Sequence, residues 1–137
     1  MKFEDSIYYS SLKHRLIELP FGKFYLFDHF IISEINSEVH FDWKKIEKLI
    51  YLLVEHYGEN IKIAYISNRV NLYSFDPYLW IKFEKDYGFI VASAMVCYDE
   101  RNKMNASLEK HISNNSIKRC WNLNKAIEWV QNLKEFN

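Results

Sequence analysis

The stretch that decides the fold is Phe-Ile-Val-Ala-Ser-Ala-Met-Val-Cys, residues 89–97, which is apolar at every position except Ser93. A strand with one face in water alternates apolar and polar side chains, and this run does not alternate. Such a run is typical of a strand inside a parallel sheet, where helices cover both faces. It therefore predicts an α/β fold with residues 89–97 in the middle of the sheet.

Upstream of this run, the chain is expected to begin with a strand hairpin. Residues 14–19 and 23–27 form its strands, and Pro20-Phe21-Gly22 forms the turn, because proline fixes φ and glycine permits a positive one. Residues 30–35 form a third strand, or continue the second strand after a bend. Residues 1–12 are left unassigned.

The clearest helical pattern spans about residues 42–57. Asp42 is the expected N-cap and Gly58 the expected C-cap. A strand at residues 61–66 and a loop at residues 67–75 follow. Apolar side chains recur at helical spacing on one face of the helix: Ile46, Leu49, Ile50, Leu53, Val54 and Tyr57.

Three more helices and one more strand complete the pattern. A short helix runs from Asp76-Pro77 to about Tyr87, since proline is well tolerated at the first helical position. Asp99 caps the next helix, which ends at Asn114-Asn115 and turns inward Met104, Leu108 and Ile112. A short strand at residues 117–121 precedes a final helix, whose inward face carries Leu123, Ala126, Ile127, Val130 and Leu133.

This order of elements predicts a small mixed sheet that is mostly parallel, with an N-terminal antiparallel hairpin and about four helices. The length of 137 residues fits a single α/β domain over residues 1–137. Only 3 glycines and 2 prolines are present, so no flexible linker is expected.

The composition narrows the partners that we expect. Lys plus Arg and Asp plus Glu both number 18, so the chain lacks the basic excess of a nucleic-acid-binding protein, and no nucleic-acid partner is expected. The start of the chain shows no signal peptide, and no apolar run reaches the roughly 18 residues of a membrane span. The expected location is the cytoplasm, with Cys97 and Cys120 as reduced, buried thiols.

The pattern resembles the STAS/SpoIIAA-like domains, as a stand-alone bacterial member. The residues that carry the resemblance are the run at 89–97 followed by Asp99, the strand at 117–121, and Ala-Ile-Glu-Trp-Val at 126–130. The resemblance implies a SpoIIAA-like fold and a regulatory or protein-interaction role, as in the anti-sigma-factor antagonists. Those domains bind a partner kinase and are switched by phosphorylation of a Ser or Thr after a central strand. The matching turn here begins at Ser67, which follows Tyr65-Ile66 where an acidic residue would stand.

Ligands of open α/β sheets bind beyond the carboxyl ends of parallel strands, and two segments leave such ends here. The candidate ligand- or partner-binding residues in these segments are Ser67, Asn68, Arg69, Tyr73, Ser74, Asp76, Asp99 and Arg101. Arg69 is suited to bind a carboxylate or phosphate with two hydrogen bonds. Ser67 and Ser74 are the candidate phospho-acceptors. The alternative is a polar surface loop in which these side chains only satisfy turns and caps.

No nucleophile–base pair, metal-ligand spacing or glycine-rich phosphate loop is visible, so no catalytic residue, metal or cofactor is expected. The five histidines are interpreted as surface or rim residues. Two functions stay open. One is a non-enzymatic module that binds a protein partner or a second copy of itself through the helix that carries Tyr78, Trp80 and Phe83. The other is a protein that binds a lipid or small anion near Arg69.

Overall fold

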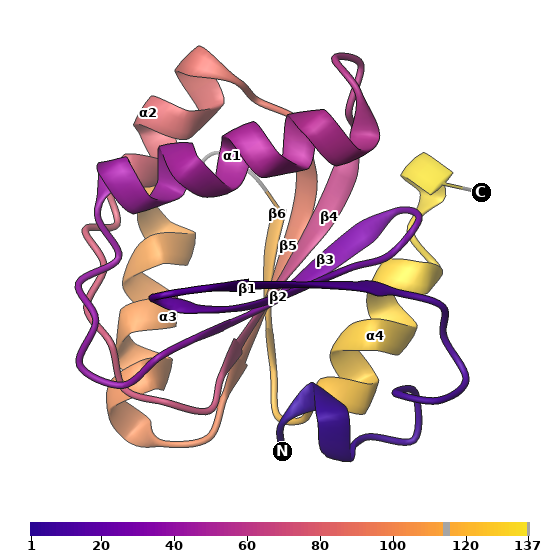
Figure 1. Ribbon diagram of the computed structural model, residues 1–137. Helices are drawn as coiled ribbons and strands as arrows, with labels where there is room; N and C mark the ends of the chain where they lie inside the picture. The colour runs from indigo at the N-terminus through magenta and orange to yellow at the C-terminus, as the bar shows by residue number, and fades with distance from the viewer. Residues whose placement is uncertain (114–115, 137) are drawn as a thin grey trace.

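Six strands form one sheet in the computed structural model, which describes residues 1–113 and 116–136 (Figure 1). The strands lie in the sheet in the order in which they occur along the chain. They are β1 (Arg15–Leu19), β2 (Gly22–Leu26), β3 (Phe30–Ile35), β4 (Ile63–Arg69), β5 (Ile90–Cys97) and β6 (Ser116–Cys120). The pairs β1–β2 and β2–β3 are antiparallel, and the pairs from β3 to β6 are parallel. The predicted mixed, mostly parallel sheet is confirmed.

The helices divide between the two faces of the sheet. They are α1 (Trp43–Tyr57), α2 (Leu79–Asp86), α3 (Glu100–Ile112) and α4 (Leu123–Gln131), with short 3₁₀ turns at Phe3–Asp5 and Lys134–Phe136. Figure 1 shows α1, α2 and α3 on one side of the sheet, and α4 with the N-terminal segment on the other. The first three helices share a face because each links neighbouring parallel strands by a crossover, and such crossovers have one hand.

Alternation along β4 sends its side chains to these two faces. Ile63 and Tyr65 join the hydrophobic core under α1, α2 and α3, whereas Ala64 and Ile66 join the core under α4. All seven residues of β4 are buried, as expected of a strand that is covered on both sides. The same alternation places Arg69 on the α1–α3 side of the sheet.

Several helix boundaries follow the capping signals in the sequence. The Asp42 side chain accepts a hydrogen bond of 3.1 Å from the Lys45 N–H, and Gly58 ends α1 with a φ of 92°. Asp99 caps α3 in the same way, with a hydrogen bond of 2.8 Å from the Asn102 N–H. The predicted helix end at Asn114-Asn115 lies outside the described residues.

The loop predicted at residues 67–75 is wrong for its first three residues. Ser67, Asn68 and Arg69 continue β4, which pairs with β5 up to Arg69 and Cys97. The polar side chains of these three residues suggested a loop. In the structure, the neighbouring strand supplies hydrogen-bond partners for their backbone, and their side chains are hydrogen-bonded on the two faces of the sheet. α2 also begins later than predicted, at Leu79, because Asp76 and Pro77 form a preceding turn.

The inward face predicted for α3 is wrong at two of its three residues. Met104 and Leu108 are 71% and 50% exposed and Ile112 is partly buried, whereas the buried residues of this helix are Asn102, Ala106 and Glu109. The helix thus turns a small residue and two polar residues toward the sheet. The physical reason is that the sheet presents a polar group there, the guanidinium of Arg69, which requires a carboxylate partner.

The unassigned N-terminal segment contributes to the core under α4. Phe3 is 0% exposed and lies among aromatic rings, with centroid distances of 4.7 Å to Tyr25 and 5.3 Å to Phe27. Burial of a phenylalanine among aromatic rings is worth several kcal/mol, since its truncation to Ala typically costs about 3–5 kcal/mol. The segment is therefore part of the folded domain.

Candidate functional site

Arg69 and Glu109 form a buried ion pair between β4 and α3. Arg69 Nη1 lies 2.7 Å from Glu109 Oε2, and Nη2 donates to Oε1 at 2.8 Å, so the pair is bidentate. Each side chain is only 4% exposed. Two charges removed from water in this way are stable only when the pairing geometry is good and the remaining donors have partners.

Neighbouring side chains complete the hydrogen bonding of this pair. The Trp80 indole Nε1 donates to Glu109 Oε1 at 2.9 Å, so three N–H groups converge on one carboxylate. Arg69 Nε donates to Ser67 Oγ at 3.0 Å, and the guanidinium lies 5.6 Å from the centroid of the Tyr73 ring. Burial alone would lower the pKa of Arg69, but Tyr73 and Glu109 hold that pKa above its ordinary value, so Arg69 is a cation.

A cavity of about 60 Å³ begins at this pair and extends between α1, α2 and the sheet. A single water needs about 10–15 Å³ in such a cavity, so there is room for a group of several atoms. Its walls are apolar apart from the ion pair and two tyrosines. The residues that line it are Ile31, Phe41, Ile46, Leu49, Ile50, Leu53, Tyr65, Arg69, Tyr73, Phe75, Leu79, Trp80, Phe83, Phe89, Ile90 and Glu109.

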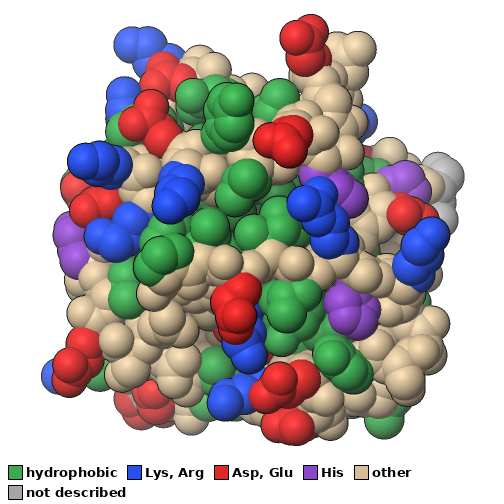
Figure 2. All heavy atoms as spheres, viewed as in Figure 1, with side chains coloured by type: hydrophobic (Ala, Val, Ile, Leu, Met, Phe, Trp, Pro, Cys, Tyr) green, Lys and Arg blue, Asp and Glu red, His purple; other side chains and the backbone are tan. Residues whose placement is uncertain are grey.

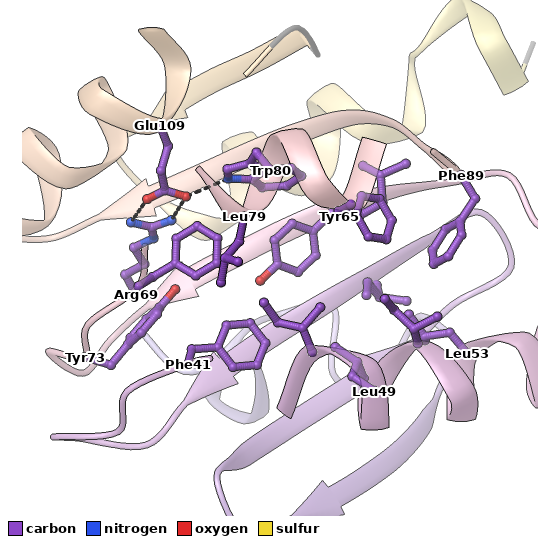
Figure 3. Close-up of a pocket in the computed structure, with 16 residues that line it drawn as sticks. Phe41, Leu49, Leu53, Tyr65, Arg69, Tyr73, Leu79, Trp80, Phe89 and Glu109 are labelled. Carbon is purple, nitrogen blue, oxygen red and sulfur yellow. Dashed lines mark hydrogen bonds and ion pairs between the residues drawn. The ribbon is translucent and has the colours of Figure 1, made fainter. Parts of the chain in front are cut away.

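Figure 3 shows that the cavity has a polar end and an apolar end. Arg69 and Glu109 lie at one end, and Phe89 and Leu53 lie at the other. The hydroxyl of Tyr65 does not add a free polar group to the middle of the cavity, because it is hydrogen-bonded to Ser33 Oγ at 2.7 Å. Such an apolar space with a few convergent polar groups is typical of small-molecule sites.

A smaller hollow of about 30 Å³ lies on the other side of the same pair. Arg69, Tyr73, Phe75 and Glu109 line both spaces. The remaining walls of the hollow are Pro77, Asn105 and Leu108, and Leu108 is half exposed. The ion pair thus stands between the inner cavity and a pocket at the surface of α3.

A second buried network forms on the opposite face, where Asn68 points. The Asn68 amide donates to Glu34 Oε2 at 2.7 Å and to the Met1 carbonyl at 2.9 Å. Glu34 also accepts the Phe3 N–H at 2.8 Å, and the Tyr98 hydroxyl donates to Asn68 Oδ1 at 2.7 Å. The backbone of the N-terminal segment thus occupies the polar groups at this end of β4.

Burial raises the pKa of the Glu34 carboxyl, and the hydrogen bonds from Phe3 and Asn68 lower it by less. The folded protein therefore favours the protonated form of Glu34 relative to the unfolded chain. Burial also raises the pKa of Tyr98 to about 12, so its hydroxyl stays a donor. This network is built to hold the N-terminal segment.

The structure separates the eight candidate residues. Ser67, Arg69 and Tyr73 come together at the ion pair, while Asn68 faces the other network. Asp99 caps α3, and the side chain of Asp76 caps the turn before α2 by accepting the Tyr78 N–H at 3.0 Å. Arg101 is exposed. Residues 70–75 pack against residues 38–41 through backbone hydrogen bonds, so this loop does not form an open crevice.

The two candidate phospho-acceptors differ in access. Ser67 is 1% exposed, and its hydroxyl is engaged by Tyr73 and Arg69. A kinase would reach it only if β4 opened. Ser74 is exposed, and its hydroxyl lies 2.7 Å from His40 Nδ1. Phosphorylation of either serine stays a prediction.

Within the described residues, the remaining chemistry-bearing side chains form no second centre of this kind. Cys97 and Cys120 are free and buried, as predicted, and burial raises the pKa of both thiols. In residues 1–113 and 116–136, no group of three or more His, Cys, Asp or Glu side chains is placed to hold a metal ion. Lys13, Asp28 and His29 line a wider hollow of about 430 Å³ beside Phe136, but all three are exposed.

Glu109 is the site residue that the sequence did not single out. Trp80 was named only as part of the helix expected to bind a partner, and not as a donor to a buried carboxylate. Glu109 was missed because Met104, Leu108 and Ile112 offered a more apolar stripe on the same helix. A usable signal exists: Asn102, Ala106 and Glu109 share a helical face, and a buried Arg elsewhere in the chain demands a carboxylate on such a face.

Comparison with known proteins supports the fold. A solved structure from Shewanella loihica PV-4, described as an uncharacterised protein from the DUF3478 family with a SpoIIAA-like fold, superposes with a TM-score of 0.57. The match covers 87% of this chain and 93% of that chain, at 10% sequence identity. No protein-family model and no curated protein matches the sequence. The chain therefore has the SpoIIAA-like fold that its sequence pattern predicted.

Among residues 1–113 and 116–136, no helix has both the length and the apolar character that crossing a bilayer requires.

The ion pair generates a stability prediction. Glu109→Gln and Arg69→Met should each destabilise the protein by about 3–5 kcal/mol, because each leaves a buried polar group without its partner. The double variant Arg69→Met/Glu109→Leu should cost less than either single variant, since no charge stays buried. Urea denaturation measures all three. Single variants within about 0.5 kcal/mol of wild type would show that the pair is not buried as described.

Glu34 generates a pH prediction. Its folded-state pKa is raised, so the native state binds more protons than the unfolded state, and stability falls as pH rises from the ordinary pKa of Glu through the raised one. Glu34→Gln should remove this part of the pH dependence and be at least as stable as wild type at pH 7. Denaturation at a series of pH values tests it, with the exposed Glu59→Gln as control. An identical pH profile for Glu34→Gln and wild type would contradict the prediction.

Proposed function

We propose that this chain is a non-enzymatic binding module that takes a small, largely apolar ligand into the cavity between α1, α2 and the sheet. The observation that carries the proposal is the cavity itself, of about 60 Å³, with apolar walls and a single buried ion pair at one end. Well-packed interiors keep few voids larger than a water molecule, so a lined cavity of this size favours a ligand.

The surroundings of the cavity support binding over catalysis. The side chains that face it are mostly aliphatic and aromatic, and the tyrosine hydroxyls are held by serines, Tyr65 by Ser33 and Tyr73 by Ser67. Burial raises the pKa of both tyrosines, so neither is a ready base or nucleophile. The groups at this site are suited to hold and orient a ligand.

The cavity generates a binding prediction with neutral probes. Xenon or propan-1-ol, which suit a cavity of about 60 Å³, should enter it and stabilise the protein by about 1.4 kcal/mol at a concentration of ten times Kd. Leu49→Phe should abolish this effect, because the ring fills the cavity, at a cost in stability of about 1–3 kcal/mol. The measurement is thermal denaturation with and without probe, together with probe-induced shifts of methyl NMR signals.

The matched control is Tyr51→Phe, which lies on the same helix and is 73% exposed. It should bind both probes as wild type does. The absence of any stabilisation or methyl shift with either probe in the wild-type protein would overturn the proposed function.

A second candidate function is interaction with a protein partner or a second copy of the chain. Large apolar side chains are exposed just before α2 and on α3, with Tyr78 at 64%, Met104 at 71% and Leu108 at 50%. The face in Figure 2 also shows hydrophobic side chains among charged ones in its upper half, over α1. Exposed aromatic and Met side chains are enriched at interfaces, and a net charge of zero gives little self-repulsion.

This second candidate predicts concentration-dependent self-association. Light scattering after size exclusion should show a growing dimer fraction as concentration rises, and Met104→Glu/Leu108→Glu should return the protein to a monomer, because like charges then meet. Glu59→Gln, on the surface outside α2 and α3, is the control. A strict monomer at millimolar concentration would contradict self-association.

A further inference from the structure

Glu109 sits where the acidic group of a ligand would sit. Arg69 Nη1, Arg69 Nη2 and Trp80 Nε1 all donate to its carboxylate, within 2.7–2.9 Å. These three donors belong to β4 and α2, so they form a carboxylate receptor that exists apart from the helix that carries Glu109. The receptor closes one end of an apolar cavity, as Figure 3 shows.

We propose that the ligand of this cavity is a small monocarboxylic acid, whose carboxylate replaces that of Glu109 on Arg69 and Trp80 while its apolar part fills the cavity. This inference rests on the proposed function, since it names the class of ligand that the cavity takes.

The free-energy balance favours such an exchange over simple insertion. A carboxylate that enters a buried site loses its hydration, which ordinarily costs several kcal/mol. Here one carboxylate enters as another leaves, so the hydration that Glu109 regains offsets what the ligand loses. The hydrogen bonds from Arg69 and Trp80 are the same in kind before and after. The apolar part of the ligand then supplies the net gain.

Glu109 has a route out of the site. The hollow of about 30 Å³ on the outer side of the pair is lined by Glu109 itself, by Asn105 and by the half-exposed Leu108. A rotation of the Glu109 side chain toward this hollow moves its carboxylate to water. α3 itself keeps its place at both ends, because Asn102 donates to the Arg69 carbonyl at 3.4 Å and the Ser113 hydroxyl donates to Glu84 at 2.7 Å.

The proposal also explains a property of α3. This helix buries only Ala106 as an apolar residue, alongside Asn102 and Glu109. A helix whose sole task was to cover the sheet would turn apolar side chains inward, as α1 does with Ile46, Leu49, Ile50 and Leu53. A buried polar contact, by contrast, can exchange one partner for another of the same chemistry.

The test compares acids with matched neutral amides at pH 7, by calorimetry on the intact chain. Butanoate should bind wild type at least tenfold more tightly than butanamide. Affinity should rise about fourfold for each methylene from acetate to butanoate, whose three tail carbons suit a cavity of about 60 Å³. The indole N–H signal of Trp80, assigned by Trp80→Phe, should shift with butanoate, because its acceptor changes.

Two variants separate the role of each charge. Glu109→Gln removes the competing carboxylate, so it should bind butanoate at least tenfold more tightly than wild type does, and butanoate should raise its Tm by more. Arg69→Met/Glu109→Leu keeps the cavity and buries no charge, so it should still bind butanamide and lose all preference for butanoate. Tyr51→Phe serves as the unchanged control.

The outcomes distinguish this inference from the proposed function. Equal affinity of wild type for butanoate and butanamide would overturn the exchange and leave the apolar cavity as a binding site. A preference for butanoate that survives in Arg69→Met/Glu109→Leu would place the acid elsewhere and also overturn it. Failure of wild type to bind either butanoate or butanamide would overturn the inference together with the proposed function.

Discussion

The bidentate ion pair of Arg69 and Glu109 is the contact on which this structure depends most. It joins the carboxyl end of a central strand to α3, and it lies in the wall of the cavity and of the outer hollow. A buried guanidinium tolerates few surroundings, because it needs a counter-charge and several acceptors at once. Much of the local arrangement, from the inward Glu109 to the orientation of Trp80, follows from that demand.

The sheet explains how the two polar networks stay apart. Asn68 and Arg69 are neighbours in β4, and strand alternation sends them to opposite faces. One face holds the N-terminal segment through Glu34 and Asn68, and the other holds α3 through Glu109. The carboxyl end of β4, where open α/β sheets bind ligands, is therefore closed on one face and hollowed on the other.

The fold was largely predictable because its signals are local. The unbroken apolar run at 89–97, the caps at Asp42 and Asp99, and the stripe of α4 each depend on neighbouring residues. The site was predictable only in part. Arg69 stood out as a polar residue after a strand, but its partner Glu109 is 40 residues away and was hidden by a competing apolar stripe. A pairing across such a distance is set by the packing of helix on sheet, which no local pattern records.

Fold and function meet at the cavity beside Arg69, which we propose to be a site for a small apolar acid. In a crystal structure of the wild-type protein with a bromine-labelled butanoate, the anomalous signal of bromine locates the alkyl chain. We expect bromine inside the cavity, the ligand carboxylate on Arg69 and Trp80, and Glu109 turned toward Asn105. Bromine outside the cavity, with Glu109 still paired to Arg69, would show that the cavity is not the acid site.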